Sequence, residues 1–223
     1  DLLSNPKVIK TKEAEFKGKT VIIATGAQPM KLGVLGEKEF VGRGVSYCAV
    51  CDGAFYKDKI VAVVGGGNAA VEEAMYLTKF ASKVYLIHRR DELRADKIVQ
   101  QRAFANEKIE FILNAVPIEI KGTNTVETLI INQNGSEKEL KTDGVFPYIG
   151  LTPNTEMING QIKQNAQGFI ETDVNMQTSV EGVYAIGDVR NTPLRQVVTA
   201  AADGAIAACS AVKYIETKTP VQV

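Results

Sequence analysis

Two thiols lie three positions apart in the segment Cys48-Ala49-Val50-Cys51-Asp52-Gly53. At this spacing, two cysteines can form and break a disulfide without moving the rest of a fold. The carboxyl group of Asp52, next to the second thiol, could pass protons during such an exchange. We therefore predict a redox-active pair, with Cys48, Cys51 and Asp52 as the catalytic residues.

Two other uses of the pair stay open at this point. Half of a zinc site would need two further thiol or imidazole ligands, and the sequence offers Cys209 and His88 alone. His88 is better placed at a nucleotide site, so we expect no metal. Two inert buried cysteines are the other alternative, although the neighbouring carboxyl group argues against it. We interpret Cys209 as a small buried residue of a helix.

A glycine-rich motif, Gly65-Gly66-Gly67-Asn68-Ala69-Ala70, follows an apolar run at residues 60–64 and precedes a helical pattern. This is the context of a G-x-G-x-x-A dinucleotide loop. Its first glycine permits a tight turn, its second lets backbone N–H groups approach a pyrophosphate, and its final alanine lets the helix pack closely. The alternative is a plain strand-to-helix turn. The cofactor-binding residues predicted from this motif are Gly65, Gly67, Asn68, Ala69 and Ala70.

Basic residues gather where the next strand ends, at His88-Arg89-Arg90 and then at Arg94. A cofactor with a free ribose 2′-hydroxyl usually meets Asp or Glu about 20 residues after the glycines. Arginine forks instead suit a phosphate dianion, so this cluster favours NADPH over NADH. The alternative is a solvated basic start of a helix, because Asp91 and Glu92 lie between the arginines.

The elements that must position these groups follow from the hydrophobic pattern. The run before the glycine motif, the helix after it and the next strand predict a β-α-β unit with parallel strands. Asn134-Gly135 is a hairpin turn signal. The predicted strands are residues 20–25, 60–64, 83–88, 110–113, 118–121, 126–132, 145–149 and 183–186, and the predicted helices are residues 69–80, 94–105 and 196–215. The predicted apolar face of the last helix consists of Val198, Ala201, Ala205, Cys209 and Val212.

Composition excludes several classes of protein. The 26 basic and 26 acidic side chains cancel, so no overall field favours nucleic acid or an anionic membrane as a partner. The longest apolar runs, at residues 61–67 and 200–208, are too short to span a bilayer. The first residues have neither the basic start nor the apolar centre of a secretion signal, which predicts a cytoplasmic protein.

Two glycine- and proline-marked connectors, near residues 30 and 153, divide the chain. We expect a nucleotide-binding domain at residues 30–152, inserted into a second domain that residues 1–29 and 153–223 form. We interpret the pair of connectors as a two-stranded hinge.

Four motifs, in order along the chain, resemble those of the bacterial-type, low-molecular-weight thioredoxin reductases. CAVCDG is similar to their redox motif, GGGNAAVEEA to their NADPH loop, HRRDELRA to their 2′-phosphate site, and GVYAIGDV with RQVVTAAADGAIAA to their closing flavin motif. The resemblance extends from Ile23 to Ala208 and covers nearly the whole chain.

The resemblance implies that electrons pass from NADPH to FAD, then to the Cys48–Cys51 disulfide, and then to a thioredoxin-like protein. It implies that Cys51 lies next to the flavin, that Cys48 attacks the partner disulfide, and that Asp52 protonates the outgoing thiolate. It also implies a homodimer and a rotation of the nucleotide domain about the hinge. The further cofactor-binding residues that it implies are Ile149, Gly150, Gly187, Asp188 towards the flavin's ribityl or phosphate region, and Arg195, Gln196 and Val197 towards its ring system.

The sequence departs from the family pattern at its start. A full member begins with a β-α-β unit that carries a G-x-G-x-x-G loop for FAD, and this sequence has no second such loop. We therefore expect an α/β fold in which a Rossmann-like three-layer nucleotide-binding domain is inserted into a partial FAD-binding domain. We expect this chain alone to bind NADPH but to hold FAD weakly or not at all. The alternatives are a fragment of an alkyl hydroperoxide reductase flavoprotein and a non-catalytic NADPH-binding module.

Overall fold

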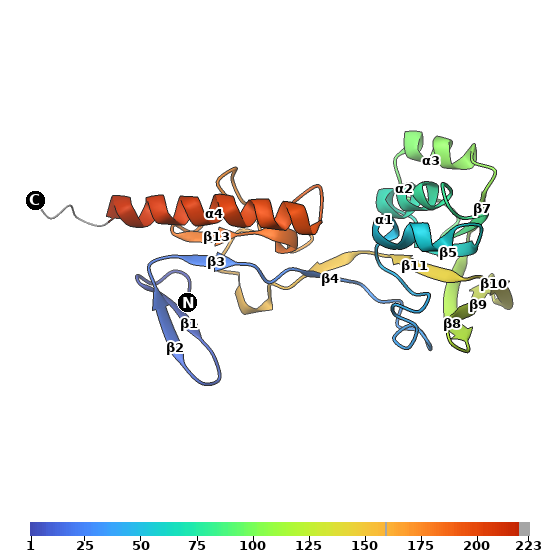
Figure 1. The fold of residues 1–223 in the computed structure, drawn as a ribbon, viewed down its shortest axis with the longest axis horizontal. Helices are drawn as coiled ribbons and strands as arrows, with labels where there is room; N and C mark the ends of the chain where they lie inside the picture. The colour runs from blue at the N-terminus through green and yellow to red at the C-terminus, as the bar shows by residue number, and fades with distance from the viewer. Residues whose placement is uncertain (159, 219–223) are drawn as a thin grey trace, which may run out of the picture. The chain divides into compact units, whose positions relative to one another are not determined.

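The chain forms two compact units (Figure 1). The structure is a computed structural model that describes residues 1–158 and 160–218. Unit 1 consists of Asp1–Gln28 and Leu151–Val223, and unit 2 is the continuous segment Pro29–Gly150. Two short strands, β4 (Ala27–Pro29) and β12 (Leu151–Pro153), pair where the chain passes between the units. The rotation predicted for this hinge stays a prediction.

Unit 2 is built on a four-stranded parallel sheet. Its strand order is β11 (Gly144–Tyr148), β5 (Ile60–Gly65), β6 (Lys83–Ile87) and β7 (Ile109–Ile112). All neighbouring pairs are parallel, which confirms the predicted parallel β-α-β arrangement. β5 is buried on both faces, as its continuous apolar run requires.

Helices cover one face of this sheet (Figure 1). They are α1 (Ala49–Asp52), the 3₁₀ helix η1 (Gly53–Tyr56), α2 (Asn68–Leu77) and α3 (Lys97–Phe104). The predicted helix at 94–105 begins three residues late. The reason is that the backbone N–H groups of Arg94 and Ala95 donate to the carbonyl of Gly66, at 2.6 and 3.1 Å, and so leave the helical path.

A three-stranded antiparallel sheet covers the other face. It has the order β10 (Ser136–Lys141), β9 (Val126–Gln133) and β8 (Ala115–Gly122), and packs through Ile120 and Leu129 onto the parallel sheet. The Asn134-Gly135 turn is confirmed, with φ of 53° and 84°. The prediction missed β10, because this edge strand carries alternating charges and buries no residue.

Unit 1 holds its own smaller core. β13 (Val183–Ala185) pairs in parallel with β3 (Val21–Ile23), and β1 (Lys7–Lys10) forms with β2 (Glu15–Gly18) a hairpin that the sequence did not predict. The long helix α4 (Val197–Lys218) packs on β13. Two 3₁₀ helices complete this unit, η2 (Glu156–Ile158) and η3 (Gly187–Val189).

The predicted apolar face of α4 is wrong. All five of its residues are exposed. Val198 is 72% exposed and Val212 is 55% exposed, and Ala201, Ala205 and Cys209 are exposed as well. The side chains that α4 buries are Asp203, Ala207 and Ala211. Alanine lies on every side of this helix, so the sequence alone does not reveal which face meets β13. The interpretation of Cys209 as a buried residue is therefore also wrong.

By length and composition, α4 could cross a membrane. It has 22 residues, and its most apolar window has a mean hydropathy of 1.2. The run at 200–208, judged too short from the sequence, belongs to this longer helix. A single such helix is weak evidence for a membrane span, because a helix in the core of a soluble protein passes the same test.

The orientation of α4 predicts that the same substitution has different effects at two nearby alanines, Ala205 and Ala207. Ala207→Lys would press an unpaired ammonium group against Met176 and Tyr184, and should lower the free energy of unfolding by on the order of 3 kcal/mol. Ala205→Lys, on the exposed face, should change it by less than about 0.5 kcal/mol. Urea denaturation followed by circular dichroism measures both. Equal losses would show that the helix faces β13 differently.

Candidate functional site

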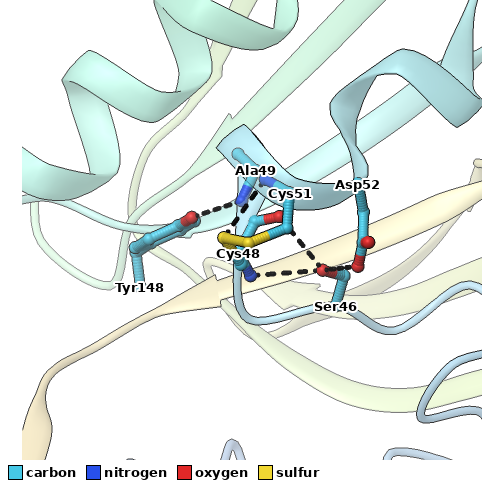
Figure 2. The surroundings of a disulfide bond; sticks show 6 residues. All are labelled: Ser46, Cys48, Ala49, Cys51, Asp52 and Tyr148. Atoms are coloured by element: carbon cyan, nitrogen blue, oxygen red, sulfur yellow. Dashed lines mark hydrogen bonds between the residues drawn. A yellow bond between two sulfur atoms is a disulfide. The ribbon is translucent and has the colours of Figure 1, made fainter. Parts of the chain in front are cut away.

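Cys48 and Cys51 are joined in a disulfide at the start of α1, with their Cα atoms 5.2 Å apart (Figure 2). Cys48 is the N-cap residue of α1, and its sulfur accepts the backbone N–H of Cys51 at 3.2 Å. Cys51 is exposed and Cys48 is half-buried. The structure therefore confirms that the two thiols of the C-x-x-C segment pair with each other.

Ser46 ties Asp52 to the redox segment. Its hydroxyl donates to Oδ2 of Asp52 at 2.6 Å and accepts the backbone N–H of Cys48 at 3.2 Å (Figure 2). The carboxylate predicted to move protons is thus held in a fixed network that ends at the first cysteine. The sequence analysis did not single out Ser46, since a serine two residues before a cysteine carries no signal of its own.

Tyr148, at the end of β11, was also missed. Its hydroxyl oxygen accepts the backbone N–H of Ala49 at 2.7 Å. Burial, together with the negative charges of Glu73 and Asp52, raises the pKa of Tyr148 to about 12, although the hydrogen bond from Ala49 works in the opposite direction. The phenol is therefore protonated throughout the neutral range.

The glycine motif forms the predicted turn between β5 and α2. A Cβ atom on Gly65 would lie 2.4 Å from the carbonyl oxygen of Tyr148 and 2.7 Å from Cβ of Ala70, and one on Gly66 would lie 2.3 Å from Nδ1 of His88. A Cβ atom on Gly67 would meet nothing within 4 Å. The first two glycines therefore serve close packing, whereas Gly67 opens to free space at the start of α2.

The arginine segment folds back onto the glycine motif. Asn68 donates through Nδ2 to Asp96 at 2.8 Å and accepts the backbone N–H of Asp96 at 2.7 Å. Together with the bonds from Arg94 and Ala95 to the Gly66 carbonyl, this pair fixes the segment beside the loop. Sequence reasoning missed Asp96, which looks like an ordinary surface carboxylate.

The basic groups at this edge are available to a ligand. Arg89, Arg90 and Arg94 are exposed, and within residues 1–158 and 160–218 none of them forms a salt bridge. His88 is buried, and its Nε2 atom has no partner in the described part of the chain. Burial, followed by the charges of Arg94, Arg90 and Arg89, lowers the pKa of His88. The imidazole is therefore neutral near pH 7.

A pocket in unit 2 joins these groups to Tyr148. Its wall also includes the apolar side chains of Met30, Leu32 and Val34 from the connector. Of the predicted residues near it, Asn68, Ala69, Arg90 and Gly150 are exposed, Gly67 is half-exposed and Ala70 is buried against β5. The predicted residues that line the pocket are Gly65, His88, Arg89, Arg94 and Ile149.

A buried carboxylate that the sequence analysis overlooked shapes this wall. Glu37 is 2% exposed and accepts the backbone N–H groups of Leu32 and Gly33, both at 2.8 Å, and the hydroxyl of Tyr47 at 2.9 Å. Burial and the carboxylate of Glu37 raise the pKa of Tyr47 to about 12. The connector that begins near residue 30 is thus an ordered part of the site.

The residues predicted to contact a flavin lie in unit 1. The backbone N–H of Gly187 donates to Asp203 at 3.0 Å, and Arg190 binds both oxygens of the same carboxylate at 2.7 and 3.2 Å. The hydrogen bonds from Arg190 hold the pKa of Asp203 below its usual value. Asp203, an acid within the alanine-rich part of α4, is a further residue that the prediction did not identify.

Arg195, another predicted cofactor-binding residue, also lies in unit 1. Its guanidinium carbon lies 4.3 Å from the centre of the Phe169 ring, and its Nε atom is buried with no partner among the described residues. Burial lowers the pKa of Arg195, and the charge of Asp188 opposes that shift. Gln196 donates its backbone N–H to Thr199 at 3.2 Å, and Val197, at the start of α4, is 88% exposed.

The predicted residues therefore fall into two groups. Unit 2 brings together the disulfide, the glycine motif and the arginines, and unit 1 brings Gly187 and Asp188 together with the start of α4. Within the described ranges, no group of three or more His, Cys, Asp or Glu side chains could hold a metal ion.

Comparisons with known proteins agree on one family. The model of the pyridine nucleotide-disulphide oxidoreductases matches residues 2–204. The chain is 54% identical to the thioredoxin reductase of Bacillus subtilis, over 94% of this chain and 67% of that protein. It is 51% identical to the thioredoxin reductase of Peptoclostridium litorale, over 97% of this chain and 71% of that protein.

Solved structures give the same result. The thioredoxin reductase of Streptococcus pyogenes is 48% identical with a TM-score of 0.86, over 95% of this chain and 73% of that one. The thioredoxin reductase of Giardia duodenalis is 38% identical with a TM-score of 0.89, over 97% of this chain and 72% of that one.

The ion pair between Arg190 and Asp203 predicts a contribution to stability that depends on pH. A carboxyl group whose pKa is lower in the folded chain stabilises the fold above its unfolded pKa, and this contribution is lost as pH falls through the folded pKa. Asp203→Asn should therefore lower the free energy of unfolding by on the order of 2 kcal/mol at pH 7. The difference from the parent should shrink below about pH 4. Urea denaturation from pH 7 to pH 3 measures it, and a difference independent of pH would contradict this role.

Proposed function

Because the chain belongs to the pyridine nucleotide-disulphide oxidoreductases and, within them, is a homologue of the bacterial low-molecular-weight thioredoxin reductases, we propose that it passes electrons from NADPH, through FAD, to a thioredoxin-like protein. One observation carries the proposal. A disulfide and an open, arginine-edged pocket beside a glycine loop belong to the same folded unit. Unit 2 is then the nucleotide and redox domain, and unit 1 is part of a flavin-binding domain.

The residues present fit NADPH. The open position at Gly67 leaves room for a pyrophosphate at the amides of Asn68 and Ala69, at the start of α2. The exposed forks of Arg89, Arg90 and Arg94 suit the 2′-phosphate. The buried, unpartnered Nε2 atom of His88 is a polar group in the pocket wall that a bound nucleotide could satisfy.

The residues of unit 1 fit a flavin in a similar way. Asp188 would hold the ribityl or phosphate region, and Arg195, Gln196 and Val197 would face the ring system. The buried Nε atom of Arg195, which lacks a described partner, is the observation that supports this fit. When bound, FAD supplies the carrier that accepts a hydride from nicotinamide and passes two electrons to a disulfide.

The chain's own redox step is thiol–disulfide exchange. The reduced pair attacks the partner disulfide through one thiolate, which forms a mixed disulfide and releases one partner thiolate. The second cysteine then attacks the mixed disulfide, so that the Cys48–Cys51 bond re-forms and the partner leaves as a dithiol. We assign the first attack to Cys48, from the family resemblance, and the second to Cys51. Asp52, oriented by Ser46, donates the proton that the outgoing thiolate takes up.

Other parts of the account stay predictions. Homodimer formation and a cytoplasmic location rest on the resemblance and on composition. The alternative interpretation, a fragment of an alkyl hydroperoxide reductase flavoprotein, has less support than a thioredoxin reductase. The relatives described above are thioredoxin reductases.

The arginine edge predicts which nucleotide the pocket selects. Arg89→Ala with Arg94→Ala should weaken NADP⁺ binding by about 10-fold or more, because each arginine can give a charge-assisted hydrogen bond worth roughly 1.5–3 kcal/mol. Binding of NAD⁺ should hardly change, since it lacks the 2′-phosphate. Isothermal titration of both nucleotides measures the selectivity.

Arg102→Ala is the matched control, because Arg102 lies in the last turn of α3 and does not line the pocket. It should leave both affinities unchanged. Equal binding of NADP⁺ and NAD⁺ to the parent chain would contradict the proposal that the pocket selects NADPH.

The division of roles between the cysteines predicts which variant traps a partner. Reduced Cys51→Ser should accumulate a mixed disulfide with oxidised thioredoxin, because the resolving thiol is missing. Reduced Cys48→Ser should trap much less. Mass spectrometry of the non-reduced protein detects the product. Cys51 is the more exposed residue of the pair, and trapping by Cys48→Ser alone would reverse the assignment.

A further inference from the structure

Part of the apolar wall of the pocket comes from the connector that enters unit 2. Every second residue of this segment lines the pocket, namely Met30, Leu32 and Val34. Leu32 and Val34 are half-buried, and they pack with Ile149 against the core between the parallel and the antiparallel sheet. This part of the wall therefore lies on the face of the parallel sheet that the helices do not cover.

The backbone of this segment depends on Glu37, which is 2% exposed. Its carboxylate accepts the successive N–H groups of Leu32 and Gly33, both at 2.8 Å. Its own backbone N–H donates to the carbonyl of Val34 at 3.3 Å. Two consecutive amides that converge on one anion form the kind of concave site that backbone nests make. Within the part of the chain that the structure describes, the backbone of residues 31–34 forms no other hydrogen bond.

The two ends of the segment have anchors of their own. Met30 donates its backbone N–H to the carbonyl of Gly150 at 3.0 Å, and the carbonyl of Leu35 accepts an N–H group of β8 at 2.9 Å. Between these anchors, Gly33 has φ of 73°, so the chain turns there and pairs with no strand. Among the described residues, Glu37 is thus the one that holds this turn through hydrogen bonds.

The arginine edge of the pocket is anchored separately. The backbone N–H groups of Arg94 and Ala95 bond the carbonyl of Gly66, and Asn68 bonds Asp96 twice. None of these bonds involves residues 30–37. The two sides of the pocket can therefore be changed one at a time.

We propose that Glu37 is a positioning residue that holds the side chains of Leu32 and Val34 in place as a preformed apolar wall of the pocket. A wall that is already ordered does not have to be ordered when a nucleotide binds, so Glu37 raises the affinity without lining the pocket itself. Because selection of the 2′-phosphate belongs to the separately anchored arginines, Glu37 raises the affinities for NADP⁺ and NAD⁺ by the same factor. This inference rests on the proposed function, because it takes the pocket to be the nucleotide site.

Glu37→Gln tests the proposal, because it keeps the size of the side chain and removes its charge. The amide has one oxygen for the two backbone N–H groups and turns its NH₂ group toward one of them. Isothermal titration should show that NADP⁺ and NAD⁺ each bind about 5-fold more weakly than to the parent. This factor corresponds to one side chain that must be ordered on binding, at about 1 kcal/mol. The ratio of the two affinities should stay that of the parent.

Tyr47→Phe is the matched control. It removes the third bond to the same carboxylate, which the Tyr47 hydroxyl donates at 2.9 Å, and it leaves both backbone N–H bonds in place. Tyr47 does not line the pocket. This variant should lose stability in urea, because a buried hydrogen bond is gone, but should bind both nucleotides within about 2-fold of the parent.

A double-mutant cycle tests whether Glu37 acts through the wall. Leu32→Ala with Val34→Ala removes the apolar side chains that Glu37 is proposed to place. In that background, Glu37→Gln should weaken NADP⁺ binding by less than about 2-fold. A loss there as large as in the parent background would show that Glu37 acts by another route, and the proposal would be wrong.

Hydrogen exchange of the parent chain makes the test independent of how well the variants fold. The amides of Leu32 and Gly33 should be protected before any nucleotide is added, because Glu37 already accepts both of them. NADP⁺ should then add little protection. Protection that arises only with NADP⁺ would show that the wall forms on binding, against the proposal.

The outcomes distinguish this inference from the proposed function. An unchanged affinity in Glu37→Gln, or an equal loss in Tyr47→Phe, overturns the positioning role and leaves the nucleotide site standing. A loss for NADP⁺ alone would place the effect at the arginine edge, which also overturns it. A parent that binds neither nucleotide overturns the proposed function, and the positioning role with it.

Discussion

The close approach of three backbone segments at the end of β5 is the constraint on which the rest of unit 2 depends. Gly65 has no room for a side chain between the Tyr148 carbonyl and Ala70, and Gly66 has none beside His88. Because these atoms touch, β11, α2 and the end of β6 meet at one point. The arginine segment can then bond the Gly66 carbonyl, and the hydroxyl of Tyr148 can reach Ala49. Nucleotide chemistry and thiol chemistry are neighbours as a consequence of packing.

Three partly or fully buried carboxylates, two in unit 2 and one in unit 1, are held by hydrogen bonds. The carboxylates of Asp52, Glu37 and Asp203 all have hydrogen-bonded partners, which is what allows acidic groups in partly or fully buried positions. Three buried side-chain atoms have no partner among the described residues, Nε2 of His88, Nε of Arg195 and Oε2 of Glu73, and His88 is the one of these residues that lines the pocket of unit 2.

Sequence was informative wherever chemistry required a particular residue type in a particular order. The C-x-x-C pair, the glycine turn, the parallel β-α-β unit and the Asn134-Gly135 turn all follow from local rules, and each is present. The face of α4 could not be predicted, because its alanines lie on every side and its packing partners, among them Met176 and Tyr184, decide which of them are buried. Glu37, Ser46 and Tyr148 escaped notice for a related reason. Each acts through a hydrogen bond to a residue that no sequence rule links to it, and its residue type alone indicates nothing.

The central claim is that one folded unit holds both the nucleotide pocket and the redox pair. Hydrogen exchange of the backbone amides, with and without saturating NADP⁺, tests it most directly. The account predicts slower exchange at residues 67–69 and at Arg94 and Ala95, with little change in the hairpin of β1 and β2. Protection confined to unit 1, or no protection at the glycine loop, would contradict it.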